Sequence, residues 1–135
     1  MFPNPVTVLR FIYVCLDMNS GRLLLVDDEE EILELLRLSF REFESVTAIS
    51  AAAALDALRQ SHFDVLITDI RMPGESGLSL IDRARAADPG LIIIVITGHH
   101  QEVPPDIRPK VHHWILKPFK RQMIRDAVLG ALATR

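Results

Sequence analysis

The chain has 135 residues, of which 49% are apolar and 24% charged, and its formal net charge is −3. This size and composition are typical of one globular domain with a substantial core. The sequence has no block of Lys and Arg, which argues against direct nucleic-acid binding through counterion release. The one cysteine, Cys15, excludes an internal disulfide and fits a reducing compartment. We therefore expect a cytoplasmic protein.

Residues 1–20 form an N-terminal extension ahead of the first core strand. Their apolar run, residues 6–16, is interrupted by Arg10 and is shorter than the roughly 20 residues that a membrane-spanning helix needs. The start also lacks the basic residues and cleavage site of a signal peptide, so we expect no membrane association. Two interpretations stay open: an extension of little consequence, with a natural start near Met18, or an extra strand or docking arm.

From Arg22 onward, strand and helix patterns alternate through a domain that spans residues 21–135. Apolar runs typical of buried strands occupy residues 23–26, 46–49, 65–68, 91–96 and 113–116. Helical patterns occupy residues 29–43, 51–60, 77–87 and 119–132. Such alternation predicts an α/β domain, doubly wound, with a parallel sheet and helices on both faces. No output domain is expected after it.

Polar side chains stand where the predicted strands end. They are Asp27 and Asp28, Asp69, Thr97, and Lys117. Because right-handed crossovers bring all the strand ends to one edge of the sheet, where ligands bind in such folds, these residues are expected to share a site.

The predicted site has the composition of a phosphoryl-transfer centre. Neighbouring carboxylates repel one another unless a cation joins them, and Mg²⁺ is the hard ion that prefers oxygen ligands. An aspartate can accept a phosphoryl group as an acyl phosphate. Lys117 adds a positive charge and Thr97 a hydroxyl donor, which suit stabilisation of a phosphoryl group in transfer.

Four motifs together resemble the receiver domain of two-component response regulators. The chain contains, in order, Val26-Asp27-Asp28-Glu29, then Asp69 with Met72-Pro73-Gly74 and Gly77, then Ile96-Thr97-Gly98, then Lys117-Pro118-Phe119. The resemblance covers residues 21–133. It implies a five-stranded flavodoxin-like sheet of order 2-1-3-4-5.

The resemblance also implies residue roles. Asp69 would accept the phosphoryl group from a phosphohistidine of a sensor histidine kinase or a histidine phosphotransfer protein. Asp28, Asp69 and the carbonyl of Arg71 would bind Mg²⁺ directly, and Asp27 mainly through water. Lys117 would contact the phosphoryl oxygens and Thr97 would carry the conformational switch. The Lys117–Pro118 bond is expected to be cis.

Trp114 stands three residues before Lys117, where the family places an aromatic switch residue. It either follows Thr97 inward on phosphorylation or stays in one packed rotamer. Arg71 and His99 occupy positions that tune hydrolysis of the acyl phosphate in the family. They either change the phosphorylated lifetime or are solvated side chains without kinetic effect.

Residues 101–110 depart from the family pattern. Pro104, Pro105 and Pro109 forbid a regular helix interior. The helix that the family places here, the fourth of its domain, is therefore expected to be short, displaced or missing. Since receivers signal through that helix, the last strand and the last helix, we expect an altered surface toward a downstream protein or a homodimer partner. The pairs His99-His100 and His112-His113 lack the ligand spacing of a zinc site, and we predict none.

Three functions are compared. The preferred one is a single-domain, Mg²⁺-dependent response regulator, which is no enzyme beyond its own phosphorylation and dephosphorylation. The alternative is a receiver-like interaction module that acts without phosphorylation. An aspartate-nucleophile phosphatase of the haloacid-dehalogenase type is disfavoured, because Arg71 stands where such enzymes carry an acid-base Asp.

Overall fold

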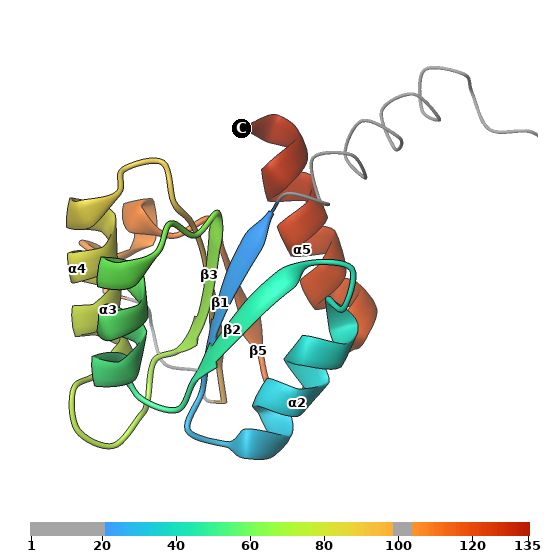
Figure 1. Ribbon diagram of the computed structural model, residues 1–135, viewed down its shortest axis with the longest axis horizontal. Coiled ribbons are helices and arrows are strands. Elements are labelled where there is room, and N and C mark those ends of the chain that lie inside the picture. Colours follow the sequence, from blue (N-terminus) through green and yellow to red (C-terminus); the bar gives the residue numbers. More distant parts are fainter. Residues whose placement is uncertain (1–20, 99–103) are drawn as a thin grey trace, which may run out of the picture.

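The fold is a parallel sheet with helices on both faces (Figure 1). The computed structural model describes residues 21–98 and 104–135. In these ranges the sheet has five strands in the order β2-β1-β3-β4-β5, all of them parallel. The strands are β1 (Arg22–Val26), β2 (Glu44–Ala48), β3 (Val65–Asp69), β4 (Ile92–Thr97) and β5 (His113–Leu116). The predicted fold class and strand order are confirmed.

Two apolar cores lie on opposite faces of the sheet. One packs α3 (Ala51–Gln60) and α4 (Gly77–Ala87) against the sheet, and the other packs α2 (Glu30–Ser39) and α5 (Arg121–Thr134) (Figure 1). All residues of β3 and β4 are buried, because these central strands are covered on both sides. None of the described helices has the length and apolar composition needed to cross a membrane.

The first helix is shorter than the sequence pattern predicted. It ends at Ser39, not at residue 43, because Phe40 leaves helical geometry with φ −129° and ψ 37°. The turn that follows brings Phe40 and Phe43 into the same core, with their ring centroids 5.8 Å apart in an edge-to-face arrangement. Burial of both aromatic rings therefore accounts for the early end of the helix.

The connection between β4 and β5 holds only a short helix in its described part, as expected. This is the 3₁₀ turn η1 (Arg108–Lys110). Arg85 of α4 anchors it, donating to the Lys110 carbonyl from Nε at 3.2 Å and from Nη2 at 2.7 Å. An ion pair between Lys110 and Asp82 adds a second tie to α4. The turn is thus held by side chains of a neighbouring helix.

Candidate functional site

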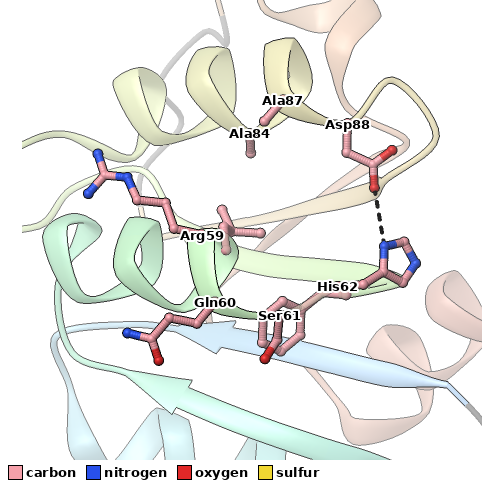
Figure 2. Close-up of a pocket in the computed structure, with 9 residues that line it drawn as sticks. Arg59, Gln60, Ser61, His62, Ala84, Ala87 and Asp88 are labelled. Carbon is pink, nitrogen blue, oxygen red and sulfur yellow. Dashed lines mark ion pairs between the residues drawn. The ribbon is translucent and has the colours of Figure 1, made fainter.

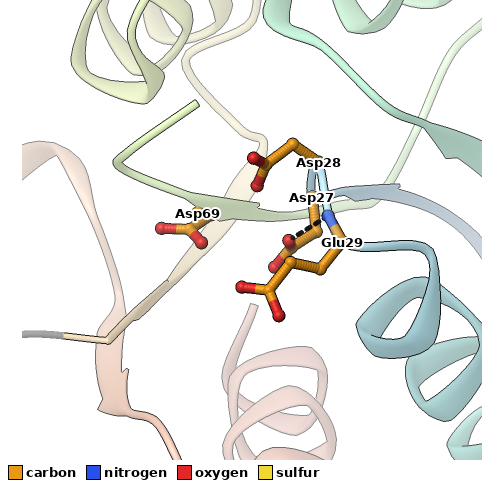
Figure 3. Close-up of side chains that lie close together, drawn as sticks. All are labelled: Asp27, Asp28, Glu29 and Asp69. Carbon is orange, nitrogen blue, oxygen red and sulfur yellow. Dashed lines mark hydrogen bonds between the residues drawn. The ribbon is translucent and has the colours of Figure 1, made fainter. Parts of the chain in front are cut away.

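The strand-end residues predicted to share a site do converge. Asp27 follows β1, Asp69 ends β3 and Thr97 ends β4, and all three are buried. Lys117 follows β5, and its backbone N–H donates to the Thr97 carbonyl at 2.7 Å. Figure 3 shows Asp27, Asp28, Glu29 and Asp69 gathered at this edge of the sheet.

Lys117 is the cation at the centre of the site. Its Nζ donates to Asp69 Oδ2 at 2.8 Å, to Asp27 Oδ2 at 2.9 Å and to Glu29 Oε1 at 3.3 Å. Burial by itself would lower the pKa of Lys117, but the hydrogen bonds and charges of Asp69 and Asp27 outweigh that effect and raise it. Lys117 therefore stays an ammonium ion.

Asp27 lies almost fully inside the protein, at 1% exposure. Burial, together with the nearby charge of Asp69, raises the pKa of its carboxyl group, although the Glu29 backbone N–H and Lys117 act to lower it. The Glu29 N–H donates to Oδ1 at 2.9 Å. Asp27 is thus a carboxylate that a further cation would stabilise.

Four carboxylates outnumber the one ammonium here. Oxygen atoms of Asp27, Asp28, Glu29 and Asp69 all lie within 4.8 Å of one another. Asp28 and Glu29 are exposed, whereas Asp27 and Asp69 are buried. A compact set of oxygen donors with excess negative charge fits a hard divalent cation such as Mg²⁺.

Glu29 was quoted in the first motif of the sequence, but it was given no role in the predicted site. It is the N-cap of α2, but its side chain caps no backbone N–H. The side chain instead reaches Lys117. Its place directly after Asp27 and Asp28 was the signal that could have identified it.

The loop after β3 holds Asp69 in place. Its Oδ1 accepts the Arg71 backbone N–H at 3.1 Å. Gly74 turns the chain back with a φ of +83°, a conformation that glycine adopts without steric cost. At Gly77, an added Cβ would lie only 2.0 Å from the Asp69 carbonyl oxygen and 2.8 Å from Cα of Ile70. Only glycine lets α4 begin this close to the end of β3.

The other predicted site residues have the following positions. The Lys117–Pro118 bond is cis. Trp114 lies on the edge strand β5 at 44% exposure, and the Arg71 side chain is exposed. His99 and the N-terminal extension, residues 1–20, lie outside the described residues.

The histidines of the described residues form no group of three or more potential metal ligands. His62 is exposed, with Asp64 at 3.7 Å and Asp88 at 3.9 Å from its two ring nitrogens. Figure 2 shows His62 in a groove between α3 and α4. This groove adjoins the start of β3, whereas Asp69 lies at the other end of that strand. His112 is engaged differently, because its Nδ1 accepts the Ile93 backbone N–H at 3.2 Å.

Comparison with known proteins identifies the same family as the site motifs. The family model of the response regulator receiver domain matches residues 23–129. The chain is 30% identical over 121 residues to the alginate biosynthesis transcriptional regulatory protein AlgB of Pseudomonas putida, covering 87% of the chain and 27% of AlgB. It is 32% identical over 117 residues to the transcriptional regulatory protein GlrR of Escherichia coli, covering 83% of the chain and 26% of GlrR. The chain therefore spans about a quarter of these relatives.

Solved structures share the fold. The response regulator protein TrrA of Thermotoga maritima, crystallised with Mg²⁺ and BeF, superposes with a TM-score of 0.76 at 29% identity. The superposition covers 82% of this chain and 98% of the TrrA chain. A receiver domain protein of Clostridium thermocellum gives a TM-score of 0.77 at 25% identity, covering 84% of this chain and 95% of the other.

Proposed function

The chain belongs to the response regulator receiver domain family, and from this premise we propose that it accepts a phosphoryl group on Asp69. The donor is a phosphohistidine of a sensor kinase or of a histidine phosphotransfer protein. The reaction depends on Mg²⁺, and the phosphorylated chain signals to a downstream protein. Its chemistry is confined to its own phosphorylation and dephosphorylation.

One observation carries the proposal: the contact of Asp69 with Lys117 at 2.8 Å, beside the buried Asp27. These residues come from the ends of three different strands, and 48 residues separate Asp69 from Lys117 in the sequence. An ordinary ion pair on the protein surface would not be buried in this way. A nucleophilic carboxylate with a fixed ammonium beside it does suit phosphoryl transfer.

The step that we propose forms one bond and breaks another. A carboxylate oxygen of Asp69 bonds to phosphorus as the P–N bond of the donor breaks, and the imidazole nitrogen leaves with that electron pair. Lys117 then moves its hydrogen bond from Asp69 to a phosphoryl oxygen. Asp27, Asp28 and Asp69 would hold Mg²⁺, together with the Arg71 carbonyl, and the bound ion would neutralise charge on the phosphoryl oxygens.

The signalling surface proposed for the chain lies along β5 and α5. Large apolar side chains are exposed there: Trp114 at 44%, Leu116 at 43% and Met123 at 51%. Trp114 and Leu116 share one face of β5, because side chains two residues apart on a strand point the same way. Such exposed apolar groups favour a protein partner, and a homodimer is one form this can take.

The experiment that tests the proposal is intact mass spectrometry after incubation with Mg²⁺ and acetyl phosphate. Wild type is expected to gain one phosphoryl group, and Asp69→Ala none. Asp56→Ala is the matched control, because Asp56 is an exposed aspartate on α3 and its loss should leave the adduct unchanged. No adduct on wild type would favour the alternative, an interaction module that acts without phosphorylation.

Two further assays address the switch and the lifetime. Trp114 is the only tryptophan, so its fluorescence should change on phosphorylation if it follows Thr97 inward. Constant fluorescence in a phosphorylated sample would exclude that movement.

We also propose that Arg71→Ala changes the rate of dephosphorylation, and an unchanged rate would assign Arg71 no kinetic role.

A further inference from the structure

Glu29 gives Lys117 a third carboxylate partner. An ammonium has three hydrogens to donate, and Lys117 directs one each to Asp69, Asp27 and Glu29. The Glu29 bond is the longest, at 3.3 Å, and its carboxylate is the most exposed of the three, at 58%. Lys117 is thus shared between two buried carboxylates and one that faces solvent.

The backbone of Glu29 is tied to the same group. Its N–H donates to Asp27 Oδ1 (Figure 3). Its side chain reaches the Lys117 ammonium, which also binds Asp27 Oδ2. The start of α2 is therefore linked to Asp27 through the main chain and to Lys117 through the side chain. No cap hydrogen bond competes for the Glu29 carboxylate.

We propose that Glu29 is a positioning residue that draws Lys117 away from Asp69 and so favours entry of a divalent cation. This inference rests on the proposed function, because it concerns the ion that the acidic cluster would hold. Lys117 already binds the carboxylates of Asp69 and Asp27, which the cation would also need as ligands. Because Glu29 also accepts a hydrogen bond from Lys117, the bond between Lys117 and Asp69 is weaker. The negative charge of Glu29 also attracts the cation directly.

Both effects of Glu29 act in the same direction. Glu29→Gln removes one negative charge next to the site and offers Lys117 a neutral amide oxygen in place of a carboxylate, which holds an ammonium more weakly. For a divalent ion several ångströms away in water, loss of one charge lowers the affinity about tenfold without salt and about threefold when salt screens it. We expect the dissociation constant for Mg²⁺ to rise by about three- to tenfold in the variant.

The test is calorimetric titration of the full chain with MgCl₂, without a phosphoryl donor. Glu31→Gln is the matched control: it makes the same change of net charge on an exposed residue of the first turn of α2, outside the acidic cluster. The affinity of Glu31→Gln for Mg²⁺ should stay within about twofold of wild type, since exposed charges at a distance are largely screened. Glu29→Asp, which keeps the charge on a shorter side chain, separates the charge effect from the contact with Lys117.

The outcomes distinguish the inference from the function it rests on. Equal affinities for Glu29→Gln and Glu31→Gln, with wild type binding Mg²⁺, overturn the role of Glu29 and leave the site intact. If the wild-type chain does not bind Mg²⁺, or if the Asp28→Ala variant binds it as tightly as wild type, both the site and the inference are overturned. If Glu29→Asp binds Mg²⁺ as weakly as Glu29→Gln does, the contact of Glu29 with Lys117 is required. If it binds Mg²⁺ as tightly as wild type, the negative charge alone accounts for the effect.

Discussion

Replacing Gly77 by alanine tests how closely α4 must approach β3, the strand that ends at Asp69. The new Cβ would lie 2.0 Å from the Asp69 carbonyl oxygen, 2.8 Å from Cα of Ile70 and 3.0 Å from the Asp69 carbonyl carbon. All three are backbone atoms of the end of β3 and the following loop, so no side-chain rotation relieves the clash. Helix and strand must separate by more than about 1 Å to restore ordinary contact distances.

The free-energy cost follows from two terms. Overpacking against a rigid neighbour costs about 1–3 kcal/mol. The separation also strains the hydrogen bond from the Gly77 N–H to the Ile70 carbonyl, 2.9 Å long, whose loss costs about 1 kcal/mol. We therefore expect Gly77→Ala to lower the free energy of unfolding by about 2–4 kcal/mol.

Gly130 supplies the matched control. It lies in α5, and an added Cβ there meets nothing within 4 Å. Gly130→Ala should raise the free energy of unfolding by about 0.5–1 kcal/mol, because alanine favours the helix. Equilibrium urea unfolding followed by circular dichroism measures both variants. A Gly77→Ala protein within about 0.5 kcal/mol of wild type would refute the reasoning, since overpacking costs more than that.

Three further predictions concern charged and titrating groups. Lys117→Met leaves Asp27 and Asp69 without their ammonium partner and should cost about 3 kcal/mol at pH 7; the deficit should shrink at acidic pH. Partial desolvation of the ring, Arg85 and His113 lower the pKa of His112. Its neutral form therefore contributes stability above pH 6.5 that is lost as the pH falls toward the lower folded pKa, and His112→Asn should flatten this loss. Arg85→Met removes the anchor of η1 and should cost about 1.5–3 kcal/mol.

Each of these predictions has a control. Lys120→Met changes an exposed lysine and should leave stability near wild type, and an equal loss would contradict the buried-pair argument. His113→Asn should reduce this pH dependence less than His112→Asn does, because His113 is the smallest of the three causes that lower the pKa of His112. Equal slopes of unfolding free energy against pH for wild type and His112→Asn would contradict the assignment. Arg83→Met removes only an exposed ion pair with Glu75, worth about 0–1 kcal/mol, and a loss as large as that of Arg85→Met would contradict the anchor.

The alternation of apolar runs and helical patterns was sufficient to predict the parallel sheet and which residues meet at its edge. Strand identity depends on local apolar composition, and convergence of strand ends follows from the handedness of the crossovers. Asp27, Asp69, Thr97 and Lys117 could therefore be assigned to one place before any distance was known. The prolines of residues 101–110 likewise predicted that the helix before β5 would be short, displaced or missing, because proline acts locally, and the described part of this connection holds only the short turn η1.

Tertiary structure decided the features that depend on distance between remote segments. The helix α2 ends at Ser39 because two aromatic rings share one core, which helical periodicity does not reveal. Gly77 and the Asp69 carbonyl approach one another only once α4 packs on the sheet. Glu29 has the local sequence of a helix N-terminus, and it joins the site because Lys117, 88 residues away, lies within hydrogen-bonding distance. Such contacts are set by packing geometry and not by local residue preference.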